Sequence, residues 1–165
     1  MIKSSQDNFE DKPYGATPVG FLVELDEIEE KSISFLRSIN SHSHHRFDLT
    51  SNIIICLGHL KGKEFIKCLE KIGNILFVHG RRKFEQHDVS CQCIGADEAL
   101  FAEIVRTSNT GRKDDVITMS SLFVNSELII PFVELIEEFG LELKELISRS
   151  PKTNYLFDKT YSKFH

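Results

Sequence analysis

The sequence predicts a single α/β or α+β domain, with a mixed sheet of about five strands flanked by helices. Residues 52–57 and 74–79 are short apolar runs, and the segment between them is amphipathic at helical spacing. Residues 52–79 are therefore expected to form one βαβ unit with parallel strands. The chain has 165 residues, 41% hydrophobic and 27% charged, which is typical of one globular domain.

The first third of the chain predicts an arm, a strand and a helix. Residues 1–16 are polar and then turn-rich, which favours a flexible N-terminal arm. Residues 19–25 place apolar side chains on one face of a predicted strand. Asp26 is expected to cap the following helix, which ends near Asn40 and has acidic residues in its first turn.

The middle of the chain predicts the βαβ unit. After a polar loop at 41–50, residues 52–57 are expected to form a central strand buried on both faces. The amphipathic segment 63–72 predicts a helix, and Gly73 is well placed to end it. Residues 74–79 then return as the second strand of the unit.

The last half of the chain predicts two further strands and two helices. The strands are expected at 87–94 and 116–124. Asp97 and Ser126 are expected to cap the helices, and Gly140 to break the second one. Residues 141–148 fit either another helix or an edge strand. The domain thus spans 17–150, and aromatic residues in the tail 151–165 favour partial packing of that tail.

Charge and hydropathy argue against several classes of protein. A net charge of −5 disfavours direct binding to nucleic acid, which needs basic side chains for phosphate. The apolar run 53–57 is far too short to span a membrane, and the N-terminus does not resemble a signal peptide. We therefore expect a cytoplasmic protein whose four cysteines, Cys56, Cys68, Cys91 and Cys93, form no disulfide.

Acidic segments suggest a protein-binding function without catalysis. No nucleophile motif or carboxylate dyad is present, which favours a protein that is not an enzyme but leaves a catalytic pair from distant positions open, and no cofactor is implied. An acidic surface would suit an inhibitor or immunity-type protein that neutralises a basic toxin such as a nuclease, because opposite charges steer association. The expected contact residues are Glu24, Asp26, Glu27, Glu29, Glu30, Glu134, Glu137 and Glu138.

A phosphate or anion site is the first alternative. Residues 58–63 form a glycine-containing turn between a predicted strand and helix, where free N–H groups can hold an anion. A second basic turn at 80–83 would open at the same edge of a parallel sheet. The expected ligand residues are Lys61, Lys63, Arg81 and Arg82, with His59 or His79 as acid or base in a small enzyme.

A metal site is the second alternative. His42, His44 and His45 are dense enough in sequence to hold zinc or copper. His87, Cys91 and Cys93 share one face of the predicted strand at 87–94, and one further histidine would complete a site. The spacing matches no standard zinc motif, so a solvated histidine loop and two core cysteines explain the same residues.

Overall fold

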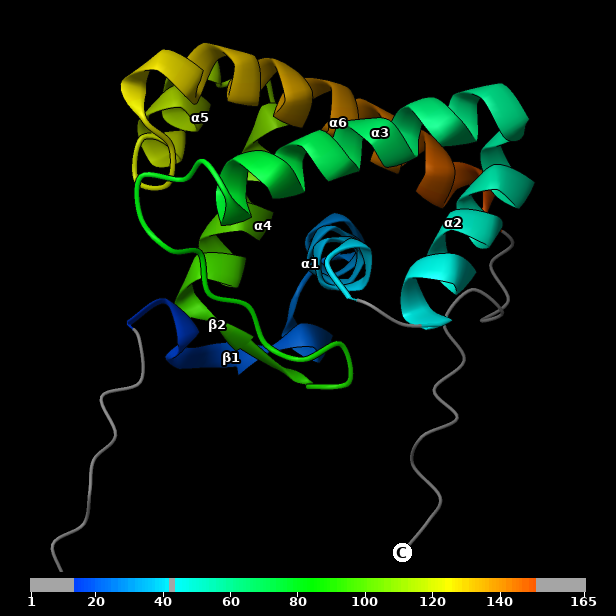
Figure 1. Ribbon diagram of the computed structural model, residues 1–165, viewed down its shortest axis with the longest axis horizontal. Coiled ribbons are helices and arrows are strands. Elements are labelled where there is room, and N and C mark those ends of the chain that lie inside the picture. The colour runs from blue at the N-terminus through cyan, green and yellow to red at the C-terminus, as the bar shows by residue number, and fades with distance from the viewer. Residues whose placement is uncertain (1–13, 42–43, 151–165) are drawn as a thin grey trace, which may run out of the picture.

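The computed structural model describes residues 14–41 and 44–150 (Figure 1). This part of the chain contains six α-helices, three short 3-10 segments and a two-stranded antiparallel sheet. The predicted mixed sheet of about five strands is therefore wrong, and so is the α/β class. The predictions made for the arm before residue 14 and for the tail at 151–165 lie outside the described residues.

The sheet joins the start of the chain to its middle. Strand β1 (Pro18–Phe21) pairs antiparallel with β2 (Cys93–Gly95), with Phe21 opposite Cys93. The predicted strands at 19–25 and 87–94 are each partly confirmed, although residues 22–24 form the 3-10 segment η2 and residues 87–92 a loop. A further 3-10 segment, η1 (Tyr14–Ala16), precedes β1.

Helix α1 (Glu27–Ile39) begins where the sequence predicted. The Asp26 side chain accepts a hydrogen bond from the Glu29 backbone N–H at 2.9 Å, and Glu29 accepts one from Asp26 N–H at 3.1 Å. This reciprocal pair satisfies backbone donors that have no partner within the helix. The capping prediction is thus confirmed.

The predicted βαβ unit at 52–79 is wrong, because both of its strands are helical. Residues 52–57 are the last turns of α2 (His44–Leu57), and 74–77 are the end of α3 (His59–Phe77). The apolar runs satisfy helical as well as strand spacing: Ile53 and Leu57, four residues apart, are both buried. Short apolar runs do not distinguish a buried strand from a buried helix.

A close contact between backbones joins α2 to α3. Gly58, with φ of 85°, turns the chain between the two helices. A Cβ atom at Gly62 would lie 2.9 Å from the Cα of Ile54, so only glycine permits this approach. The glycines that suggested a phosphate-binding turn therefore shape a helical hairpin.

The remaining helices are α4 (Ala96–Ser108), α5 (Lys113–Ser120) and α6 (Ile129–Arg149). The predicted strand at 116–124 is wrong, because it covers the end of α5 and a turn. Before α6, residues Ser126–Leu128 form the 3-10 segment η3. Gly140 does not break α6: it is buried against Ser108 and Asn109, so residues 141–148 continue the helix.

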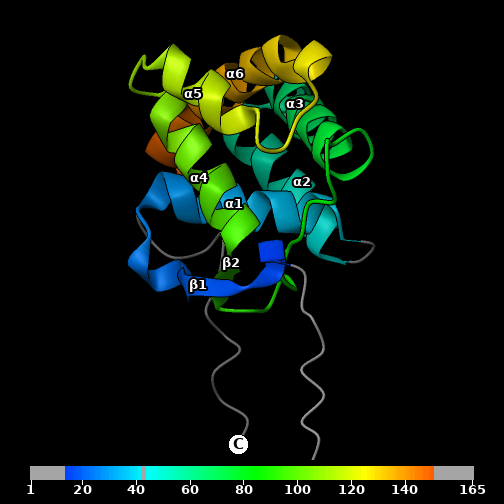
Figure 2. The same cartoon turned by 90° about the vertical axis from the view of Figure 1, so that its left-hand side faces the viewer.

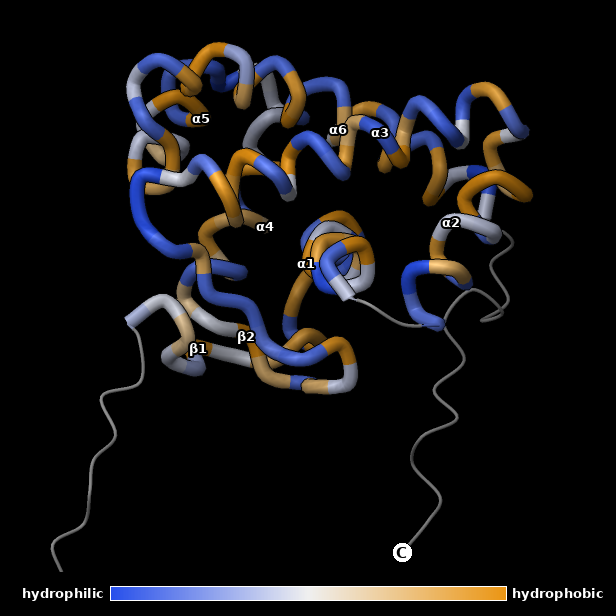
Figure 3. Tube along the Cα trace, viewed as in Figure 1, coloured by the Kyte–Doolittle hydropathy of each residue, from blue (hydrophilic) through white to orange (hydrophobic). Residues whose placement is uncertain are grey.

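One main hydrophobic core unites all six helices. Figures 1 and 2 show α3 and α6 at one end of the molecule, the sheet at the other, and α1 between them. The hydropathy colouring in Figure 3 shows apolar positions recurring along α3 and α6, as amphipathic helices require. Phe65 and Phe139 meet in this core, with ring centroids 5.3 Å apart. Among the described residues, no helix is long and apolar enough to cross a membrane.

Candidate metal centre

The loop between α3 and β2, together with the first residue of β2, carries a group of potential metal ligands that lie close together. It descends from the end of α3 to the sheet (Figure 1). Phe84 anchors it in the core, where its ring meets those of Phe77, Phe101 and Phe123. The second half of the loop, residues 87–92, contains His87 and Cys91, and Cys93 begins β2.

A buried ion pair holds this half of the loop in place. The guanidinium of Arg37, on α1, binds both carboxylate oxygens of Glu98, on α4, at 2.6 and 2.7 Å, and both side chains are 1% exposed. Glu98 also accepts hydrogen bonds from the backbone N–H groups of His87 and Gly95. The attraction within a buried ion pair offsets the cost of desolvating both charges only when their remaining hydrogen-bonding groups also have partners, as they do here.

Arg37 also forms hydrogen bonds with the backbone around both cysteines. Its terminal nitrogens donate to the carbonyl oxygens of Asp88, Cys91 and Cys93 at 3.2, 2.7 and 2.8 Å. Ser90 donates from both its backbone N–H and its hydroxyl to the Asp88 carboxylate, and these hydrogen bonds lower the pKa of Asp88. These hydrogen bonds fix the backbone of residues 88–93, and none of them involves a cysteine sulfur atom.

The ring of His87 is oriented by a backbone carbonyl. Its Nε2 lies 2.8 Å from the carbonyl oxygen of Ala16, which can only accept, so Nε2 carries the proton. The other ring nitrogen, Nδ1, lies 3.2 Å from both the Sγ and the carbonyl oxygen of Cys93 and 3.9 Å from Cys91 Sγ. In histidines that bind metal, one ring nitrogen commonly donates to a carbonyl in this way while the other faces the metal. In His87 the nitrogen that faces the two sulfurs also lies beside the Cys93 carbonyl oxygen.

Cys91 and Cys93 are joined by a disulfide, with their Cα atoms 5.5 Å apart. The expectation that no disulfide forms is therefore wrong. It rested on the assumed compartment, and it ignored that a bend in the chain brings cysteines two residues apart into bonding range. Both side chains are partly exposed, unlike the buried thiol of Cys68.

The three side chains form the one His/Cys/Asp/Glu cluster in residues 14–41 and 44–150 whose geometry suits a metal ion. One ligand atom from each lies within 4.8 Å of the others. In a tetrahedral zinc site with ordinary bond lengths, a nitrogen and a sulfur ligand lie about 3.6 Å apart. The two Nδ1–Sγ distances of 3.2 and 3.9 Å bracket that value. Reduction to thiolates would thus leave a donor set of two sulfurs and one imidazole.

The other histidines in the described part of the chain do not join this cluster. His44 and His45 are exposed in the first turn of α2. His45 does act on the loop through its charge, as one of the smaller influences that lower the pKa of Asp88. His42 lies outside the described residues. The ligand atoms of His87, Cys91 and Cys93 lie close together, but a loop brings them together and not the predicted face of a strand, and metal binding stays a prediction.

The predicted anion-binding residues lie apart. Lys61 and Lys63 are in the first turns of α3, whereas Arg81 and Arg82 follow its last turn, about 28 Å away for a helix of 19 residues. Lys61 pairs with Glu145, and Arg82 binds the buried carboxylate of Asp97 at 2.5 and 2.8 Å. The convergence expected of the two turns required a parallel sheet. His59 and His79 likewise lie at opposite ends of α3, both exposed.

The acidic residues expected to contact a partner fall into two groups. Glu24 and the first turn of α1 lie beside the sheet, and α6 runs along the opposite end of the molecule (Figures 1 and 2). Glu29 faces Arg106 at 3.5 Å, and Glu137 faces Lys113 at 3.2 Å. Docking of a basic protein stays a prediction, but the acids do not form one continuous face.

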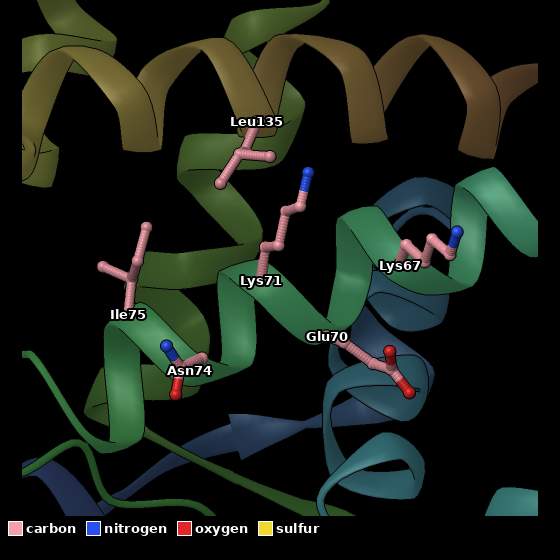
Figure 4. Close-up of a pocket in the computed structure, with 6 residues that line it drawn as sticks. All are labelled: Lys67, Glu70, Lys71, Asn74, Ile75 and Leu135. Atoms are coloured by element: carbon pink, nitrogen blue, oxygen red, sulfur yellow. The ribbon is translucent and has the colours of Figure 1, made fainter.

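A groove of about 450 Å³ lies over α3, and none of the predicted site residues is among those that line it. Figure 4 shows Leu135 of α6 facing Lys71 across it, with Glu70 pointing to the other side. The Glu70 carboxylate is already paired with Arg46 at 2.5 Å. The groove is therefore an open, mixed surface whose charges are partly neutralised within the protein.

Sequence reasoning missed the two residues that position the loop, Arg37 and Glu98. A usable signal existed for Arg37, because it stands between Leu36 and Ile39 on the buried side of an amphipathic helix. A charged residue in such a place needs a buried partner. Nothing in the sequence distinguishes Glu98 from the many other acids.

Comparison with known proteins finds no matching family model, no matching curated protein and no matching solved structure. The function proposed below therefore depends on the geometry of the loop.

Proposed function

We propose that the protein, with its cysteines reduced, binds one zinc ion through His87 Nδ1 and the thiolates of Cys91 and Cys93. The observation that carries this proposal is the orientation of His87, whose Nε2 is held by the Ala16 carbonyl while Nδ1 faces both sulfurs. Thiolate and imidazole donors favour zinc over the hard cations magnesium and calcium. With three protein ligands, the fourth position of a tetrahedral ion is open to water or to another ligand.

The surroundings support the proposal. The side chain of His87 is only 13% exposed, and the neighbouring ion pair of Arg37 and Glu98 is 1% exposed, so His87 and the backbone of the two cysteines are held in place before any ion arrives. A backbone that is already ordered avoids the entropic cost of ordering a mobile loop on binding. The acidic docking hypothesis has no comparable geometry, since its residues lie at two ends of the molecule.

Titration of the reduced, untagged protein with Co²⁺ tests the proposal, because thiolate coordination produces a charge-transfer absorbance that histidine or carboxylate ligands do not. We expect one equivalent bound per chain and displacement of the cobalt by Zn²⁺. Cys91→Ser, Cys93→Ser and His87→Ala should each weaken binding by more than the roughly 10–100-fold that loss of an outer partner costs.

Two matched controls separate this site from other thiols and histidines. Cys56→Ser removes a partly exposed thiol outside the cluster, and a His44→Ala/His45→Ala variant removes the exposed pair on α2. Both should bind cobalt as the parent protein does. Cobalt binding with the affinity of the parent protein in both Cys91→Ser and Cys93→Ser would overturn the proposal.

A further inference from the structure

The Cys91–Cys93 disulfide is poorly suited to stabilise the fold. A disulfide stabilises a protein mainly by restricting the unfolded chain, and the effect grows with the length of the loop that it closes. Here one residue, Gln92, separates the two cysteines, so the loop is close to the shortest possible. The backbone on both sides is already held by Arg37, which donates to the carbonyl oxygens of Cys91 and Cys93.

The pair is also placed where reagents can reach it. Both cysteines are partly exposed and Gln92 between them is exposed, whereas Cys68 is 2% exposed in the core. Exposed disulfides are typically the labile or regulatory ones, and buried ones the inert ones. Short loop, independent backbone support and access to solvent together indicate a bond that forms and breaks in the folded protein.

We infer that Cys91 and Cys93 form a reversible redox couple that controls metal binding, the disulfide form excluding the ion and the dithiolate form holding it. The inference rests on the proposed zinc site. A sulfur atom in a disulfide has no thiolate charge to offer a metal, and a thiolate bound to zinc is not joined to its neighbour. The same three side chains therefore have two mutually exclusive states.

The chemistry balances with a peroxide as oxidant. One thiolate attacks a peroxide oxygen and becomes a sulfenic acid, and the second thiolate then attacks that sulfur and forms the disulfide. Overall, two zinc-bound thiolates, one hydrogen peroxide and two protons yield one disulfide, two waters and a free Zn²⁺ ion. A small dithiol reverses the step by exchange: it is oxidised to its own cyclic disulfide, and both cysteine thiols are restored.

The fold allows both states without large rearrangement. Arg37 and Glu98 contact the backbone of residues 87–95 and not the sulfur atoms. His87 keeps its hydrogen bond to Ala16 whether Nδ1 faces a metal or a disulfide. Only the two short cysteine side chains must turn, so exchange between states requires no unfolding of the helices.

The test uses the full chain loaded with one equivalent of zinc and then treated with hydrogen peroxide. Free zinc is followed with a chromophoric chelator, and thiols are blocked by alkylation before digestion. Trypsin should release residues 84–106 as one peptide containing both cysteines, since no Lys or Arg lies between Lys83 and Arg106. The intramolecular disulfide then appears as an unalkylated peptide two hydrogens lighter than the dithiol.

We expect loss of the bound zinc at the same rate as disulfide formation, and recovery of one bound zinc per chain after dithiothreitol. Cys56→Ser should behave as the parent protein, because that thiol takes no part. Zinc that stays bound while the disulfide forms, or leaves without it, would overturn the inference and leave the zinc site standing. A reduced chain that retains no zinc before peroxide is added would instead overturn the proposed function itself.

Discussion

At the scale of single residues, the buried ion pair of Arg37 and Glu98 positions the loop that contains the candidate metal site. The hydrophobic pattern of the sequence does not reveal this pair. Arg37 and Glu98 are each 1% exposed. Arg37 donates to the carbonyl oxygens of Cys91 and Cys93, and Glu98 accepts from the backbone N–H groups of His87 and Gly95. Loss of either side chain would leave the other as a buried charge without a partner, which is strongly destabilising. The candidate metal centre therefore depends on residues that bind no metal.

The thiol of Cys68 gives a prediction at the same scale. Burial first, and then the charges of Glu138 and Glu142, raise its pKa from 9.0 to about 12. In the unfolded chain the thiol ionises near 9, so its contribution to stability is complete below that pH and is lost as the pH rises toward 12. At pH 10 this should lower the free energy of unfolding by about 1 kcal/mol relative to pH 8.

Urea unfolding of the reduced protein at pH 8 and pH 10 measures that loss. Cys68→Ala loses packing at both pH values, so the quantity to compare is the change in the free energy of unfolding between pH 8 and pH 10. The parent protein should lose about 1 kcal/mol more than the variant. Equal losses in the two proteins would show that Cys68 does not titrate in this way.

At the scale of elements, the hairpin of α2 and α3 shows how close packing of helices depends on one missing side chain. Gly62 lies against the backbone of Ile54, where a Cβ atom would be only 2.9 Å from Cα. Gly73, on the same helix, has its nearest potential contact at 3.8 Å, on the Phe77 ring. The two glycines thus differ in packing although both are buried within α3.

Alanine substitution should separate these two glycines. Gly62→Ala forces α2 and α3 apart and should destabilise the protein by about 1–3 kcal/mol. Gly73→Ala fills free space and improves helix propensity, so it should be neutral or stabilising by up to about 1 kcal/mol. Thermal unfolding followed by circular dichroism measures both, and a Gly62→Ala protein as stable as the parent would contradict the close contact.

At the scale of the whole molecule, one core ties the helices into a single unit. Its buried members come from every helix, and Phe139 of α6 packs on Phe65 of α3 with neither ring exposed. A second, small hydrophobic cluster lies beside the sheet and consists of Leu22, Ile33, Ile94 and Ala102. Ile33 belongs to α1 and Ala102 to α4, so these two helices connect the small cluster to the main core. Since α1 and α4 contribute to both clusters, neither part should be stable alone.

Removal of one central ring should therefore weaken the whole molecule. Phe139→Ala should lower the free energy of unfolding by about 3–5 kcal/mol. Far-UV and near-UV circular dichroism should still follow one transition with an unchanged dependence on urea. Two separated transitions would show that the α2–α3 hairpin and the α4–α6 helices unfold independently.

The sequence alone determined the features that depend on neighbours along the chain. The cap at Asp26 and the amphipathic course of α1 follow from local spacing. His87, Cys91 and Cys93 are close in sequence, but the bend of the loop, and not the spacing along a strand, brings their ligand atoms together. Tertiary structure decided whether the apolar runs became strands or helices, because both patterns bury the same side chains. It also joined Arg37 to Glu98 across 61 residues, a pairing that only packing of α1 against α4 creates.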